Sequence, residues 1–108
     1  MLLGLGGDGH TASLFPGSPL LQEREHLVGA SYVEAVKGYR ISLTLPVINH
    51  ARRVVFLVAG DSKAEILHKV LNDDSATGKL PSQMVHPVNG SLTWILDRPA
   101  ARLLKDQS

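Results

Sequence analysis

The 108-residue sequence contains no cysteine, which excludes disulfides, zinc–thiolate sites, iron–sulfur ligation and thiol catalysis. Aromatic residues make up only 5% of the chain, so a stacking platform for single-stranded nucleic acid is not expected. The net charge of +1 gives no strong attraction to nucleic acid or an acidic membrane. No apolar run approaches the roughly 18 residues of a membrane helix, and the start MLLGLGGDGH lacks the basic region of a secretion signal. We therefore expect a cytoplasmic protein without nucleic-acid or membrane partners.

What the sequence does contain is typical of a folded α/β protein of about one domain, with 44% hydrophobic and 19% charged residues. The continuous apolar run Val54–Ala59 is typical of a strand buried on both faces of a parallel sheet. The segment Tyr39–Leu45 instead alternates, with an apolar face and a polar face that begins at Arg40. The alternation of strands and helices predicts α/β architecture, with a mostly parallel sheet and flanking helices.

The predicted elements follow from these patterns and from the proline and glycine positions. We expect strands at Leu2–Leu5, Leu27–Val33, Tyr39–Leu45, Val54–Ala59 and Leu92–Leu96, helices at Pro46–Ala51, Asp61–Leu71 and Pro99–Leu104, a helical turn at Leu80–Val85, and loops at Thr11–Glu25 and Asn72–Lys79. A core of this size is marginal in isolation, and exposed strand edges and unburied apolar faces would favour association.

A glycine-rich loop follows the first predicted strand. Its letters match G-x-G-x-x-G, but Pro16 and Gly17 come too soon for the helix that a dinucleotide site needs. The alternative is a tight turn without a ligand. Asp8 and His10 lie in this loop at the carboxyl end of a strand, where His10 could accept a proton from water and Asp8 could orient it. The same spacing is also compatible with an ordinary surface loop.

Two cations have positions that suggest an anion. Arg40 begins the polar face of its strand, where it binds a ligand or forms a structural salt bridge. Lys63 lies in the first turn of a predicted helix, where the helix dipole disfavours it by roughly 0.3–1 kcal/mol. A bound phosphate would explain Lys63, and a solvated side chain is the alternative. Both cations are expected at strands of one sheet.

The remaining histidines carry no catalytic or metal-binding pattern. His26, His50, His68 and His86 lack the spacing of metal ligands, and no H-E-x-x-H is present. No G-x-S-x-G supports a serine hydrolase.

The segment LLGLGGDGHTASLFPGSPLL strongly resembles the signature of the 6-phosphogluconolactonase family. The segments YRISLTLPVINHARRVVFLVAGDSKAEILHKVL and LPSQMVHPVNGSLTWILDRPAARLL resemble those that follow it there, so the similarity covers essentially the whole sequence. Related glucosamine-6-phosphate deaminases share the G-x-G-x-D-G-H opening but typically continue with Asn-Glu-Pro. The Ser13-Leu14-Phe15-Pro16 sequence found here favours the lactonases.

The resemblance implies a NagB/RpiA/CoA-transferase-like (Rossmann-like) fold and hydrolysis of 6-phosphoglucono-δ-lactone in the oxidative pentose phosphate pathway, without a cofactor. It implies that His10 is the general base, that Asp8 sets its state, and that Arg40 and Lys63 bind the substrate phosphate. The glycine loop, with Gly6, Gly7 and Gly9, would contact the substrate. From loop chemistry we expect its backbone N–H groups to stabilise the oxyanion.

Family members are usually more than twice this length, and the sequence resembles only their later half. We therefore expect residues 1–108 to be one domain and the C-terminal part of a larger glucosamine/galactosamine-6-phosphate isomerase-type domain. Such a chain would self-associate or pair with the missing N-terminal half. A non-catalytic fragment that binds sugar phosphate and a deaminase or isomerase of the same fold are the alternative functions.

Overall fold

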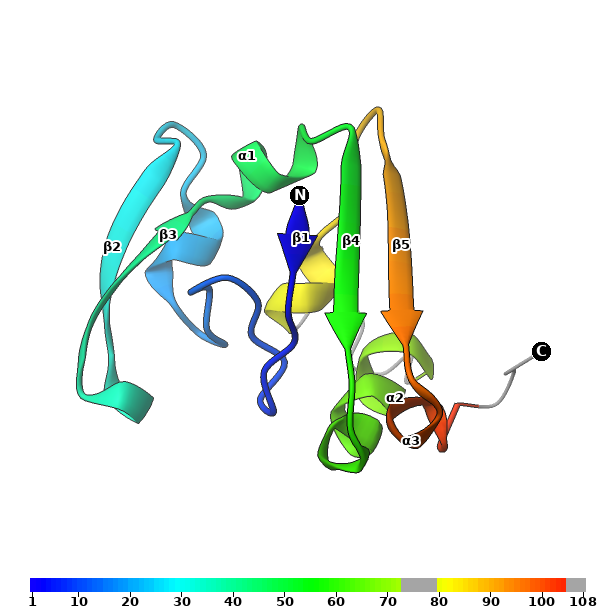
Figure 1. The fold of residues 1–108 in the computed structure, drawn as a ribbon. Coiled ribbons are helices and arrows are strands. Elements are labelled where there is room, and N and C mark those ends of the chain that lie inside the picture. Colours follow the sequence, from blue (N-terminus) through cyan, green and yellow to red (C-terminus); the bar gives the residue numbers. More distant parts are fainter. Residues whose placement is uncertain (73–79, 105–108) are drawn as a thin grey trace.

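The computed structural model describes residues 1–72 and 80–104. Its centre is a three-stranded parallel sheet in the order β1-β4-β5, formed by β1 (Leu2–Leu3), β4 (Arg53–Val58) and β5 (Ser91–Leu96) (Figure 1). The mostly parallel α/β fold expected from the sequence is therefore confirmed. Parallel pairing aligns the carboxyl ends of β1 and β4, and the loops that follow these two strands carry the predicted site residues.

One face of this sheet forms the core. Val54, Phe56 and Val58 are fully or almost fully buried, and Leu67 of helix α2 (Ala64–Asn72) is buried in the same cluster. The Phe56 ring stacks on Trp94 of β5, with 4.0 Å between ring centroids and 7° between planes. In Figure 1, part of α2 passes behind the ends of β4 and β5, and α3 (Arg98–Ala101) lies below the end of β5.

The opposite face of the sheet is largely uncovered among the described residues. Leu2, Leu57 and Ile95 lie on it and are 67%, 52% and 51% exposed. No helix crosses in front of β4 and β5 in Figure 1. The expectation that Val54–Ala59 is buried on both faces is wrong, because the described helices that flank β4 and β5 lie on one side of the sheet.

Strands β2 (Val28–Val33) and β3 (Gly38–Leu43) form a separate antiparallel hairpin. The sequence predicted that Arg40 and Lys63 lie at strands of one sheet. This prediction is wrong, because Arg40 lies on the hairpin and Lys63 follows β4 of the parallel sheet. The hairpin turns a polar face inward, where the buried Ser42 hydroxyl accepts a hydrogen bond from the Ser13 N–H at 3.2 Å. Its apolar face points outward, and its exposed side chains include Val28, Tyr32, Tyr39, Ile41 and Leu43.

Several predicted boundaries move by a few residues. Thr44 precedes helix α1, whose second residue is Pro46, so the strand before it ends at Leu43 and Leu45 is helical. Helix α1 spans Leu45–Asn49. The other helical elements within residues 1–72 and 80–104 are 3-10 turns at Pro19–Gln22, Glu34–Val36, Asp61–Lys63 and Pro81–Met84. The loop predicted at Asn72–Lys79 falls largely outside the described residues, and Asn72 itself ends α2.

Truncating a side chain on either face of β4 should destabilise the protein, but by different amounts. Phe56→Ala should lower the free energy of unfolding by about 3–5 kcal/mol, because it empties a fully buried and stacked site. Leu57→Ala, on the open face, should cost about 1 kcal/mol or less. Urea denaturation of both variants measures the difference. Equal losses would show that the open face is covered in solution.

Candidate functional site

The glycine-rich loop after β1 closes on itself through backbone hydrogen bonds. The Gly6 N–H donates to the His10 carbonyl at 2.8 Å, and the Gly9 N–H donates to the Gly6 carbonyl at 3.0 Å. Gly9 has a φ of +89°, a conformation that L side chains rarely adopt. Its carbonyl accepts the Ser82 N–H at 3.1 Å, which attaches the loop to the Pro81–Met84 turn. The loop is therefore a defined scaffold for Asp8 and His10.

Thr11 fixes the end of this loop and was not singled out by the sequence analysis. Its side chain is buried, and its hydroxyl donates to the Gly4 carbonyl at 2.8 Å. The bond joins the two ends of the loop across seven residues. A threonine directly after His10 gave no sequence signal for this role, because only the loop's closure brings Gly4 within reach.

The structure brings Asp8 and His10 together as predicted. Asp8 Oδ1 lies 2.5 Å from His10 Nδ1 and accepts the His10 backbone N–H at 3.0 Å. Burial raises the pKa of Asp8, but the hydrogen bonds from His10 outweigh it and keep this pKa below its ordinary value of 3.8. An ionised carboxylate only accepts hydrogen bonds, so the shared proton belongs to Nδ1. The lone pair of the neutral imidazole is then on Nε2.

The imidazole of His10 lies against two further residues. The Phe15 ring stacks on it, with centroids 4.3 Å apart and 24° between the planes. Gly6 approaches so closely that a Cβ atom built there would lie 2.0 Å from ring atoms Cε1 and Nδ1. No side chain fits at Gly6 while the ring keeps this position, so this glycine is needed for the geometry of the base.

Lys63 reaches the same loop from the turn after β4. Its Nζ donates to the Leu5 carbonyl at 2.7 Å, which leaves two ammonium donors for other partners. The turn begins at Gly60, whose N–H donates to both carboxylate oxygens of Asp97 at 3.1 Å. Asp97 also accepts the Ala100 N–H at 3.0 Å and so caps α3. The C-terminal helix therefore helps to position Lys63.

His10 and Lys63 line one cavity of about 420 Å³ beside β1, the outer strand of the sheet. Gly6 lines it as well, whereas Gly7 and Gly9 do not. Arg40 is exposed on the separate hairpin and is not among the cavity's lining residues. The structure thus gathers Asp8, His10, Gly6 and Lys63, and it leaves Arg40 apart.

The loop's N–H groups differ in availability. Gly6 and Gly9 already donate within the loop, so neither is free for a substrate oxygen in this conformation. Gly7 is exposed, and among the described residues its N–H has no protein acceptor. Of the three glycines, Gly7 is therefore the one that can offer a donor.

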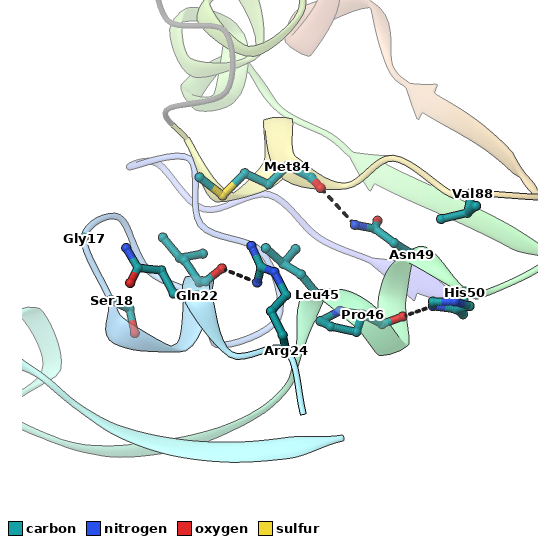
Figure 2. Close-up of a pocket in the computed structure, with 11 residues that line it drawn as sticks. Gly17, Ser18, Gln22, Arg24, Leu45, Pro46, Asn49, His50, Met84 and Val88 are labelled. Carbon is teal, nitrogen blue, oxygen red and sulfur yellow. Dashed lines mark hydrogen bonds between the residues drawn. The ribbon is translucent and has the colours of Figure 1, made fainter. Parts of the chain in front are cut away.

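A larger cavity, of about 680 Å³, contains none of the predicted site residues (Figure 2). Two of its polar side chains, Asn49 and Arg24, hydrogen-bond to backbone groups. Asn49 donates to the Met84 carbonyl at 3.2 Å, and its oxygen accepts the His86 N–H at 2.7 Å. The Arg24 guanidinium donates to the Leu21 carbonyl at 2.9 Å. Because Asn49 and Arg24 are already bonded to backbone groups, we place the candidate site at His10 and not in this cavity.

Residues 1–72 and 80–104 contain neither a metal-binding cluster nor a membrane-spanning helix. No group of three or more His, Asp or Glu side chains there is arranged to hold a metal ion. No helix within these ranges has the length and apolarity needed to cross a membrane.

Sequence comparison finds relatives along nearly the whole chain. The family model described as "Glucosamine-6-phosphate isomerases/6-phosphogluconolactonase" matches residues 1–94. The 6-phosphogluconolactonase of Rattus norvegicus is 50% identical over 106 residues, covering 96% of this chain and 40% of the relative. A probable 6-phosphogluconolactonase of Arabidopsis thaliana is 43% identical, with the same coverage of both chains. The chain thus spans about 40% of the length of these curated relatives.

Solved structures give the same result. The crystal structure of 6-phosphogluconolactonase from Leishmania guyanensis matches with a TM-score of 0.80 and 35% identity, covering 97% of this chain and 41% of that one. A monomeric glucosamine-6-phosphate deaminase of the NagB superfamily matches with a TM-score of 0.72 and 27% identity, covering 95% and 46%. The NagB-like fold expected from the sequence is therefore confirmed.

The lowered pKa of Asp8 predicts a pH dependence of stability. The unfolded chain binds the Asp8 proton more tightly, so the Asp8 contribution is fully present above about pH 5 and is lost as the pH falls through the folded pKa, below 3.8. Between pH 5 and 3 the parent should therefore lose more unfolding free energy than Asp8→Asn. Urea titrations at each pH measure this, with Glu34→Gln as the matched control. If the unfolding free energies of the parent and Asp8→Asn fell equally with pH, the lowered pKa of Asp8 would be contradicted.

Proposed function

The chain belongs to the glucosamine-6-phosphate isomerase/6-phosphogluconolactonase family, and on that premise we propose that it carries the catalytic loop of a 6-phosphogluconolactonase. The reaction is hydrolysis of 6-phosphoglucono-δ-lactone to 6-phosphogluconate. The observation that carries the proposal is that His10, which is bonded to Asp8, and Lys63 line one cavity. The cytoplasmic location expected from the sequence stays a prediction.

The geometry supports a general-base mechanism. His10 Nε2 takes a proton from water while the water oxygen bonds to the lactone carbonyl carbon, and Asp8 stabilises the resulting imidazolium. Of the three loop glycines, Gly7 has the N–H without a protein acceptor among the described residues, but it does not line the cavity of His10 and Lys63, so its contact with the oxyanion stays a prediction. As the tetrahedral intermediate collapses, the ring C–O bond breaks and the leaving oxygen takes the proton from His10. The product is an open-chain carboxylic acid with a free hydroxyl, and the acid then releases its proton to solvent and becomes a carboxylate.

Lys63 is the first candidate for binding the phosphate group of the substrate. Its ammonium group lies at the cavity and keeps two donors after its bond to Leu5. Arg40 lies on the hairpin outside the lining of this cavity, so its contact with the phosphate stays a prediction.

Glucosamine-6-phosphate deaminase is the second candidate, because a deaminase of this superfamily shares the fold at 27% identity. The curated relatives named as lactonases are closer, at 50% and 49% identity for the rat and human proteins. The Ser13-Leu14-Phe15-Pro16 sequence after the catalytic loop also favours a lactonase. Release of ammonia from glucosamine 6-phosphate, without lactone hydrolysis, would instead establish the deaminase.

We propose further that the site is completed by the part of the family domain that this chain does not span. Parallel sheets are normally covered on both faces, yet Leu2, Leu57 and Ile95 are exposed here. Strand β1 is also an outer strand and borders the His10 cavity. A segment that covers this face and pairs with β1 would therefore also close the cavity. Self-association through the same face, or sugar-phosphate binding without catalysis, are the alternatives.

Lactone hydrolysis tests the proposal directly. The chain is assayed alone and together with the N-terminal part of a related lactonase, using fresh 6-phosphogluconolactone coupled to 6-phosphogluconate dehydrogenase and subtracting spontaneous hydrolysis. We expect activity at least with the added part, and its loss by about 10²–10⁴-fold in His10→Gln, because the general base is removed. No activity in either assay, or equal activity in His10→Gln, would refute the proposal.

Lys63→Met should raise KM for the lactone by roughly 10- to 100-fold with a smaller change in kcat, because it removes a charged donor to the phosphate. Steady-state kinetics of the active form measure both constants. Lys69→Met, which removes an exposed lysine from α2, is the matched control and should change neither. An unchanged KM in Lys63→Met would assign the phosphate to another residue.

A further inference from the structure

Phe15 contacts the His10 imidazole from outside the cavity that His10 shares with Lys63. The two rings stack at 4.3 Å between centroids. His10 lines the cavity of Lys63, whereas Phe15 lines a different cavity of about 350 Å³, together with Asp8 and Tyr32. The stacked pair therefore forms part of the wall between the two cavities. A substitution at Phe15 therefore changes the stacking contact with His10, although Phe15 itself does not line the proposed substrate cavity.

Three residues fix the orientation of this ring, each in a different way. Phe15 restricts the plane of the imidazole by stacking on its face. Gly6 leaves room for Cε1 and Nδ1, where a methyl group would collide. Within that plane the ring has two orientations, related by a 180° flip, and the bond from Nδ1 to Asp8 favours one of them. Nε2 is left as the nitrogen without a protein partner among the described residues.

We propose that Phe15 is a positioning residue that holds the His10 ring where Nδ1 reaches Asp8 Oδ1 and so maintains the Nδ1–H tautomer. When the ring leaves this position, the short bond to Asp8 is lost and the proton is free to occupy either nitrogen. The functional meaning rests on the proposed role of His10 as the base, because only an unprotonated Nε2 accepts a proton from water. The geometry itself is independent of any substrate.

The tautomer of His10 is measured by long-range ¹H–¹⁵N correlation spectra of the 108-residue chain, at a pH where the spectrum shows a neutral ring. His10→Gln assigns the signals. The parent should be predominantly the Nδ1–H form. Phe15→Leu should lower the ratio of Nδ1–H to Nε2–H by about 2- to 10-fold, the range of an aromatic pair. Phe15→Tyr keeps an aromatic ring on the imidazole and should show the parental ratio of Nδ1–H to Nε2–H.

Phe56→Leu controls for loss of stability, because this residue is buried in the core and stacks on Trp94 rather than on His10. It should leave the His10 tautomer unchanged. An unchanged ratio in Phe15→Leu, or an equal shift in Phe56→Leu, would overturn the proposal.

A glycine pair supplies a second test if Phe15→Leu does not fold. Gly6→Ala places a methyl group on the imidazole and should displace the ring, with loss of the Nδ1–H preference. Gly7→Ala, where the added Cβ meets nothing within 4 Å, should keep it. The same tautomer in both variants would refute the claim that ring position sets the tautomer.

The spectra also distinguish this inference from the proposed function. A chain without lactonase activity still reports the tautomer, so failure of the enzymatic assay does not decide the role of Phe15. In an active enzyme, Phe15→Leu should lower kcat and leave KM nearly unchanged, because Phe15 does not line the cavity of Lys63.

Discussion

The hydrogen bond from Lys63 Nζ to the Leu5 carbonyl joins the two loops from which the candidate site is built. It spans 58 residues of sequence and exists because β1 and β4 are parallel neighbours, with Leu3 opposite Phe56. The carboxyl ends of both strands then lie at the same edge of the sheet. The proposed base, the cation and the cavity between them all depend on this pairing.

The loops around that bond are fixed by further hydrogen bonds. Thr11 bonds to Gly4, Ser82 bonds to Gly9, and Asp97 bonds to Gly60. Each of these bonds ends on a backbone group of a glycine near a proposed site residue. Glycines give the loops the close approaches that they need, and the added bonds restrict the freedom that glycine brings. The Asp8–His10 geometry therefore belongs to a constrained site.

Two surfaces of the described residues are uncovered. The described helices that flank β4 and β5 cover one face of the parallel sheet, and the other face exposes leucine and isoleucine. The hairpin likewise turns its apolar side outward and its polar side toward Ser13. The chain matches only about 40% of the length of its curated relatives. The proposal that the rest of the family domain covers these faces would account for both of them.

The sequence by itself determined the α/β class, most elements and the glycine loop, and it singled out Asp8, His10 and Lys63 as candidates, because periodicity, turn residues and short motifs are local signals. Tertiary structure alone decided what depends on distant contacts. The separation of Arg40 from Lys63 follows from strand pairing. One face of β4 is exposed because the described helices flank the other face. Phe56 and Leu57 belong to the same apolar run, and only the position of the helices decides that Phe56 is buried and Leu57 is exposed. The stack of Phe15 on His10 exists only because the loop closes, and a linear sequence does not specify the orientation of a ring.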